Sequence, residues 1–280
     1  MSDSSPTRGA PIGVFDSGVG GLTVLRALRA ALPLQDFIYL GDTARLPYGT
    51  KSADTVARYS VQCAAALSAR GIGCLVVACN TASAFALDEL RLRYPSMPVI
   101  GVIEPGAEAA LAASRSRHIA VIGTEGTISG GAYQRAITRR DPKARVSALA
   151  CSLFVALAEE GWTRGTVAEA VAHRYLDALF AGAAAPDTLV LGCTHFPLLI
   201  EAIRAVLPGP VRIVDSAATV AAAAMRLLPA AAAQAAPAGQ AARAGRISWL
   251  ATDGAERFAR VGSAFFGQTL EAAAVEIIDL

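Results

Sequence analysis

The chain has 280 residues, enough for two α/β domains that each bury a core of their own. Its 25 basic and 23 acidic residues leave a net charge of only +2 without runs of like charge, so nucleic acid and anionic membranes are not expected as partners. The first eleven residues are polar and lack the apolar stretch of a secretory signal, which predicts a disordered tail on a cytoplasmic protein. Residues 217–239 are rich in alanine but contain Arg226, Pro229 and Pro237, which argues against a transmembrane helix.

Short apolar runs alternate with longer helical stretches, a pattern typical of parallel α/β units. In chain order, the predicted strands are residues 12–15, 36–41, 74–78, 99–102, 119–122, 145–150, 188–191, 211–214 and 246–251. The predicted helices between them include residues 22–31, 54–69, 82–94, 167–180 and 198–207. Residues 229–245 predict a helix end and a flexible connector before a last strand and helix.

The chain also repeats itself loosely. The run IGVFDSG, which begins at Ile12, has a counterpart in IAVIGTEG, which begins at Ile119; CLVVACNT at Cys74 is answered by TLVLGCTH at Thr188. The repeat predicts two pseudo-equivalent domains with parallel sheets, each offering one cysteine at a strand end. Ligands bind beyond the carboxyl ends of parallel strands, so this placement favours a functional site.

Of the five cysteines, Cys79 and Cys193 therefore stand out. An odd number of cysteines in a chain without an export signal predicts reduced thiols rather than a disulfide framework. Each of the two precedes polar residues that can start a helix, and backbone N–H groups at a helix start lower a cysteine pKa. A single strand-end cysteine could equally be a small buried hydrophobe, but two in matching contexts favour chemistry.

Other polar residues lie near these cysteines in the sequence. His195 is the common type of partner for a thiolate, whereas His118 and His173 are predicted to be structural or exposed. Asp16 opens the glycine-rich turn Ser17-Gly-Val-Gly-Gly, which would ordinarily suggest a phosphate or dinucleotide. No Gly-Lys-Ser/Thr follows, and Asp16 would repel a pyrophosphate; only Asp42, after the second strand, keeps that alternative open.

No cofactor is expected. A zinc site at Cys79, Cys193 and His195 stays an alternative, but the paired-ligand spacing of such sites is missing. Lys51 and Lys143 are the only lysines and neither lies in a strand-end motif, so a pyridoxal cofactor is not implied either.

Four segments together resemble the glutamate racemase family: FDSGVGGL from Phe15, YLGDTARLPYG from Tyr39, ACNTAS from Ala78 and LGCTHFPL from Leu191. The match spans residues 12 to about 220, in family order and spacing. The resemblance implies two α/β domains with the active site in the cleft between them. It also implies that the second domain, 104–210, is inserted into the first, 11–103 plus 211–280.

By resemblance, Cys79 and Cys193 are the two catalytic acid/bases, assisted by Asp16 on the first side and by His195 and Glu159 on the second. The family has prolines on each side of a Phe-Val pair upstream of that glutamate, where this chain has Ser152 and Ala156. The family's substrate-holding positions match Asp16, Ser17, Tyr48, Gly49, Asn80, Thr81, Thr127, Thr194 and His195, with Thr124 pairing with Thr127.

The resemblance implies racemisation of glutamate without a cofactor, supplying D-glutamate for peptidoglycan. Two bases on opposite walls of a cleft can remove the α-proton from one face and return a proton to the other. Cys193 would serve L-glutamate and Cys79 D-glutamate. The alternatives are an aspartate or hydantoin racemase, a one-cysteine decarboxylase (which the second cysteine disfavours), a cysteine hydrolase using Cys193 and His195, and a binding protein without turnover. A homodimer is compatible with the sequence.

Overall fold

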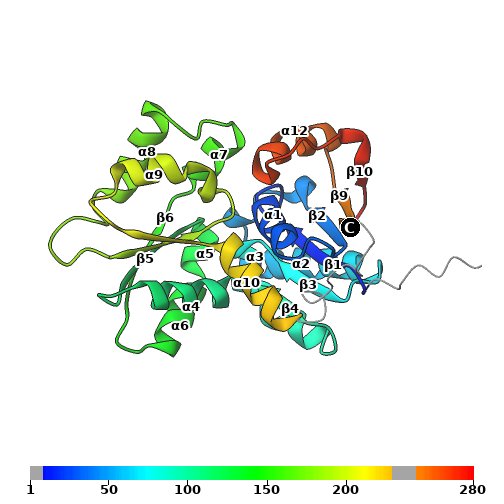
Figure 1. The fold of residues 1–280 in the computed structure, drawn as a ribbon, viewed down its shortest axis with the longest axis horizontal. Coiled ribbons are helices and arrows are strands. Elements are labelled where there is room, and N and C mark those ends of the chain that lie inside the picture. Colours follow the sequence, from blue (N-terminus) through cyan, green and yellow to red (C-terminus); the bar gives the residue numbers. More distant parts are fainter. Residues whose placement is uncertain (1–8, 229–243) are drawn as a thin grey trace, which may run out of the picture.

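Two parallel β-sheets form the framework of the protein in the computed structural model, which describes residues 9–228 and 244–280 (Figure 1). The first sheet has the strand order β10-β9-β2-β1-β3-β4 and the second has the order β6-β5-β7-β8. Every strand pair is parallel, which confirms the predicted fold class. The strands are β1 Ile12–Asp16, β2 Phe37–Gly41, β3 Cys74–Val77, β4 Val99–Gly101, β5 His118–Gly123, β6 Arg145–Ala150, β7 Thr188–Gly192, β8 Arg212–Asp215, β9 Ile247–Ala251 and β10 Val275–Ile277.

Helices cover both sheets (Figure 1). The α-helices are α1 Leu22–Ala31, α2 Ala53–Ser68, α3 Asn80–Arg93, α4 Ile103–Ala113, α5 Glu125–Ser129, α6 Ala132–Arg140, α7 Leu153–Glu159, α8 Thr166–Leu176, α9 Ile200–Val206, α10 Ser216–Leu227 and α12 Ala255–Phe266. Short 3-10 helices are η1 Thr43–Arg45, η2 Tyr48–Thr50, η3 Phe196–Leu199 and η4 Ala272–Ala274. None of the helices within the described ranges is long and apolar enough to cross a membrane.

The strand orders carry the internal repeat into three dimensions. The run β2-β1-β3-β4 of the first sheet corresponds to β6-β5-β7-β8 of the second, so that β1 matches β5 and β3 matches β7. These are the strands whose sequences resemble each other. The residues after β3 and β7, Cys79 and Cys193, therefore occupy equivalent positions in the two sheets.

Strand β8 lies in the second sheet, whereas its residues were predicted to belong to the first unit. The expected boundary gave residues 211–280 to the first unit, but β8 pairs with β7 in the second sheet, where Leu189 is the partner of Ile213. The chain therefore returns after Asp215, not before Val211. It leaves the first sheet after β4 through α4 and returns after β8 through α10, and these two helices pack against each other.

The predicted elements match the structure where apolar runs are continuous and differ from it at short or mixed segments. β10 is only three residues long and largely exposed, so its Val-Glu-Ile sequence is too short to give a recognisable strand pattern. Helix α4 contains Pro105 and Gly106 near its start; proline is tolerated there because the first-turn N–H has no partner inside the helix. Residues 1–8 of the predicted eleven-residue tail and most of the predicted connector at 229–245 lie outside the described residues.

Candidate active site

Cys79 ends the loop after β3 and caps helix α3. Its Sγ accepts from the backbone N–H of Ala82 at 3.5 Å and lies 3.6 Å from Ser17 Oγ. The predicted capping residues Asn80 and Thr81 lie inside the first helical turn instead, because the helix begins at Asn80. The thiol is only 5% exposed.

Burial decides the ionisation of this thiol. It raises the pKa of Cys79 to about 12, and the negative charge of Asp16 adds to the shift. Hydrogen bonds from Ala82 and with Ser17 oppose it but do not prevail. The prediction that the helix start lowers the pKa of Cys79 is therefore wrong for the substrate-free protein, since desolvation of a charged sulfur outweighs the helix-start N–H groups.

Cys193 follows β7 and begins a line of contacts that runs across the second sheet. Its Sγ lies 3.7 Å from Nδ1 of His195, whose Nε2 lies 3.1 Å from Oε1 of Glu159 at the end of α7. Burial lowers the pKa of His195, but its hydrogen bonds to Cys193 and Glu159 prevail and raise it to about 10. The hydrogen bond with His195 in turn lowers the pKa of Glu159. The imidazole is therefore held as a cation beside Cys193 at neutral pH.

Asp16 lies at the end of β1 with its carboxylate turned into the glycine-rich turn. Its Oδ2 accepts from the N–H of Gly18 at 3.1 Å, while Oδ1 is buried without a hydrogen-bond partner among the described residues. Burial raises the pKa of Asp16, opposed by the charge of His195 and by backbone N–H groups of the turn. This buried oxygen is suited to accept from a bound ammonium group.

Glycine is required where the turn meets the second cysteine motif. A Cβ on Gly20 would lie 2.5 Å from Nδ1 of His195 and still closer to Oγ1 of Thr194. Thr23, three residues later, donates from Oγ1 to the carbonyl of Thr194 at 3.3 Å. The turn after β1 is thus packed directly onto the loop after β7, which brings the two predicted halves of the site together.

The remaining predicted substrate-binding residues form a second contact region between the halves. The hydroxyl oxygens of Thr81, Thr124 and Thr127 lie 2.9–3.1 Å from one another. Gly49 approaches the same place, since a Cβ there would lie 2.6 Å from Cβ of Thr124.

The side chain of Asn80 points elsewhere. Its Oδ1 accepts from the hydroxyl of Tyr133 at 2.8 Å and its Nδ2 lies 3.4 Å from Ser216 Oγ.

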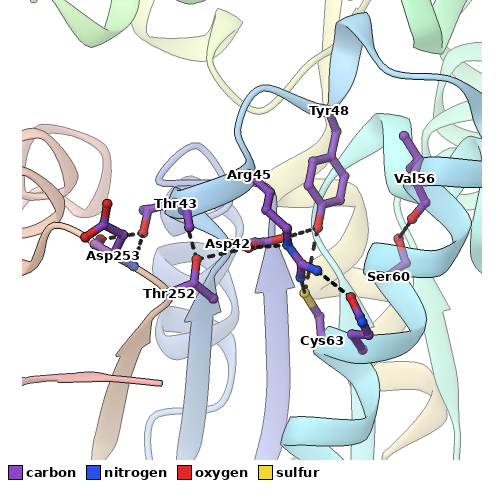
Figure 2. A network of polar contacts seen from close by, with 11 residues as sticks. Asp42, Thr43, Arg45, Tyr48, Val56, Ser60, Cys63, Thr252 and Asp253 are labelled. Atoms are coloured by element: carbon purple, nitrogen blue, oxygen red, sulfur yellow. Dashed lines mark hydrogen bonds and ion pairs between the residues drawn. The ribbon is translucent and has the colours of Figure 1, made fainter. Parts of the chain in front are cut away.

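Tyr48 points its hydroxyl into the core. The ring is fully buried and the hydroxyl donates to Oδ2 of Asp42 (Figure 2). Asp42 also accepts from Arg45 Nε at 2.7 Å and from Thr252 Oγ1 at 3.0 Å. Since both carboxylate oxygens of Asp42 are bonded within this network, Asp42 is not free to bind the ribose of a dinucleotide, as that alternative requires. Tyr48 instead fixes the loop that carries Gly49.

We expect Tyr48→Phe to lower the free energy of unfolding by about 1–3 kcal/mol, because Asp42 would lose a donor inside the core. Urea unfolding measures the change. Tyr59→Phe is the matched control: its half-buried ring packs on Tyr48 with centroids 5.8 Å apart, and the substitution keeps that ring contact. Equal stability of the two variants would contradict the role given to the Tyr48 hydroxyl.

Most of the chain is similar to a known family of racemases. The family model described as Asp/Glu/Hydantoin racemase matches residues 21–224. The chain belongs to this racemase family. It is 57% identical over 206 residues to the glutamate racemase of Geobacter metallireducens, covering 74% of this chain and 75% of that one. It is 46% identical to the glutamate racemase of Koribacter versatilis, covering 96% and 97%.

A solved structure of a family member agrees over nearly the whole chain. Glutamate racemase from Francisella tularensis, in complex with D-glutamate, superposes with a TM-score of 0.86 at 34% identity and covers 96% of this chain and 97% of that one.

Three residues near the site were not predicted from the sequence: Arg257, Tyr133 and Ser216. Arg257 donates to Glu159 from α12, some hundred residues away in the chain, at 2.9 Å. Tyr133 and Ser216 hold Asn80 from helices α6 and α10. None stands in a strand-end motif. Asp215, which caps α10 directly before Ser216, was the one local signal that a polar strand end lies there.

The remaining polar candidates have structural surroundings in this racemase. Both ring nitrogens of His118 are bonded, to Ala184 O at 2.7 Å and to Ser147 Oγ at 2.8 Å, and His173 is an exposed partner of Asp177. Over residues 9–228 and 244–280, no three His, Cys, Asp or Glu side chains gather in a way that could hold a metal ion.

Proposed function

We propose that this family member interconverts L- and D-glutamate by proton transfer between two cysteines, without a cofactor. The curated relatives at 46–57% identity named above are glutamate racemases, and the Francisella tularensis structure was solved with D-glutamate. The observation that carries the mechanism is the pair of buried thiols at equivalent strand ends of two matching sheets. Equivalent positions on facing units are what a reaction needs when it must act on both faces of one carbon.

The surroundings of the thiols suggest their resting protonation states. His195, whose pKa is raised, faces Cys193 Sγ at 3.7 Å and can balance negative charge there, whereas burial and Asp16 raise the pKa of Cys79 and keep it a thiol. In this state Cys193 removes the α-proton of L-glutamate, and Cys79 delivers its own proton to the opposite face to give D-glutamate. Cys193 is then the thiol and Cys79 the thiolate, which is the state that accepts D-glutamate. The ionisations of the two thiols are therefore linked, and apparent pKa values belong to the pair.

The developing carbanion needs hydrogen-bond donors at the α-carboxylate. Helix α3 begins at Asn80, so the N–H groups of Asn80 and Thr81 lie in its first turn, where they have no partner inside the helix. Ser17, Thr194 and the three clustered threonines supply hydroxyls around them. We infer that these donors, together with the Tyr48–Gly49 loop, hold glutamate, and that Asp16 faces its ammonium group.

One experiment tests this function. The protein is incubated with L-glutamate in D₂O without added cofactor, while optical rotation and deuterium at Cα are followed. Racemisation with one deuterium per inverted molecule is expected. No loss of rotation would contradict the proposal, and parallel reactions with aspartate and hydantoins test the alternative substrates of the family.

A second candidate is supported by the Cys193–His195–Glu159 arrangement, which is also that of a cysteine hydrolase. A hydrolase would form a covalent acyl enzyme, would not need Cys79 and would not exchange the α-proton. The D₂O experiment therefore separates the two.

We further propose that the protein works in the cytoplasm and supplies D-glutamate for peptidoglycan. A homodimer stays a prediction that sedimentation would test.

A further inference from the structure

Arg257 on the first unit contacts the carboxylate of Glu159, which faces His195 on the second unit. Arg257, in the first turn of α12, donates from Nη2 to Oε2 of Glu159 at 2.9 Å, while Oε1 of the same carboxylate faces His195. His195 then faces Cys193. The carboxylate of Glu159 is thus held at both oxygens, by one cation from each half of the molecule.

The surroundings of Glu159 offer no substitute for this arginine. The carboxylate lines a cavity of about 300 Å³ whose walls are largely apolar. Among the described residues that line the cavity, Arg257 is the only cation, and Asp253 is the only other charged group besides Glu159. Without Arg257, Oε2 would face apolar side chains and a like charge, and the 15% exposed carboxylate would gain by turning toward water.

The turn before Arg257 is fixed to the loop that carries Gly49. Thr43 Oγ1 donates to the carbonyl of Asp253 at 2.5 Å and accepts from its N–H at 2.9 Å (Figure 2). Thr252 donates to Asp42 at 3.0 Å and accepts from the N–H of Ala44 at 2.9 Å. The start of α12, and with it Arg257, is therefore placed by the same network that orders the proposed substrate loop.

We propose that Arg257 is a positioning residue for racemisation, which holds Glu159 against His195 and so keeps the imidazole oriented and protonated beside Cys193. The proposal rests on the proposed function. The groups that face His195 are Cys193, Glu159, the charge of Asp16 and the ring of Phe265, whose centroid lies 5.0 Å away. Of these, Glu159 is the one that Arg257 contacts, so Arg257 acts on the imidazole through that carboxylate.

A structural role alone would look different. The Arg257 side chain is 50% exposed, and ion pairs at such sites contribute little to stability. We therefore expect Arg257→Gln to leave the urea midpoint unchanged while kcat/KM falls roughly five- to tenfold. Arg257→Lys, which keeps the charge, should restore most of the activity. The matched control is Arg260→Gln, an exposed arginine on the same helix that has no ion pair with any residue in the described ranges.

The pH profile gives the direction of the effect. His195 is protonated below its pKa of about 10, so the activity that depends on its charge is lost as the pH rises through that value. Release of Glu159 lowers the pKa, because one of the hydrogen bonds that raised it is gone. The alkaline limb of kcat for L-glutamate should therefore move to lower pH by about one unit in Arg257→Gln and stay in place in Arg260→Gln.

The imidazole can also be followed directly. The chain has three histidines, so ¹⁵N NMR titration shows three imidazoles, and His195→Gln assigns the one in question. A lower His195 titration point in Arg257→Gln, with partial return in Arg257→Lys, supports the proposal. An unchanged titration and pH limb would overturn it, as would a fall of the urea midpoint that matches the loss of activity. If the wild-type protein failed to racemise glutamate, the proposed function would fail, while the titration would still report on Arg257.

Discussion

Cys193→Ala and Cys79→Ala should each reduce glutamate racemisation by about 10³-fold or more in both directions. Removal of a positioned acid or base typically costs 10²–10⁴-fold. Here both thiols are needed in every turnover, one as the base and the other as the acid. Polarimetry with each enantiomer measures the loss. Cys74→Ala is the control, because Cys74 is a buried thiol at the start of β3, whereas Cys79 follows the end of that strand. Full racemisation by either active-site variant would contradict the two-base mechanism.

The same variants assign each thiol to an enantiomer. The equilibrium constant between enantiomers is one, so kcat/KM must be equal in the two directions for every variant, and steady-state ratios cannot reveal which thiol serves which substrate. Exchange of the α-proton for deuterium with retention of configuration can reveal the assignment. Cys193→Ala should exchange the α-proton of D-glutamate only, and Cys79→Ala that of L-glutamate only. The opposite pattern would reverse the assignment while leaving the two-base mechanism intact.

Gly20→Ala should lower kcat/KM on the order of 10²-fold, because misplacement of a reacting group by about 1 Å can cost that much. The new Cβ would lie 2.5 Å from Nδ1 of His195 and would displace Thr194 as well. Steady-state kinetics measures the loss, and circular dichroism checks that the fold persists. The three atoms that the new Cβ would meet all belong to the loop after β7, so the substitution pushes the two halves of the site apart.

Gly18→Ala is the matched control in the same turn. Its Cβ would meet only Leu46, at an ordinary contact distance of 3.7 Å. We expect less than about a threefold change in kcat/KM for this variant, since no reacting group would be displaced. Similar losses in the two variants would show that the turn is sensitive to any side chain, and that the contact of Gly20 with His195 has no special weight.

Local patterns predicted the fold class because buried parallel strands are short, apolar and repeated. The same repeat could have placed β8. Since β1 and β3 correspond to β5 and β7, the counterpart of β4 had to be the strand after β7, in the second sheet. The boundary near Val211 came from resemblance and missed this point. β10 could not be predicted, because its three residues are largely exposed and pair only with β9.

In the site, strand-end motifs identified both cysteines, Asp16 and His195 because each lies where a local signal is strong. Arg257 carries no such signal; it reaches Glu159 only through the packing of α12 against the second unit. The ionisation of Cys79 was also mispredicted. A helix start is visible in the sequence, but the burial that outweighs it depends on how two distant loops close over the sulfur.

The pairing of α4 with α10 constrains how substrate enters. Both covalent connections between the units leave equivalent edge strands, and their helices α4 and α10 pack side by side, so the covalent links between the units are confined to one place (Figure 1). Cys79 and Cys193 are only 5% and 6% exposed, so glutamate can reach them only when the groups that cover them move aside. A movement of the units away from each other at α12 and α7 would break the pair between Arg257 and Glu159. The line of contacts from Cys193 through His195 and Glu159 to Arg257 would thus be complete only while the two units are closed on the substrate.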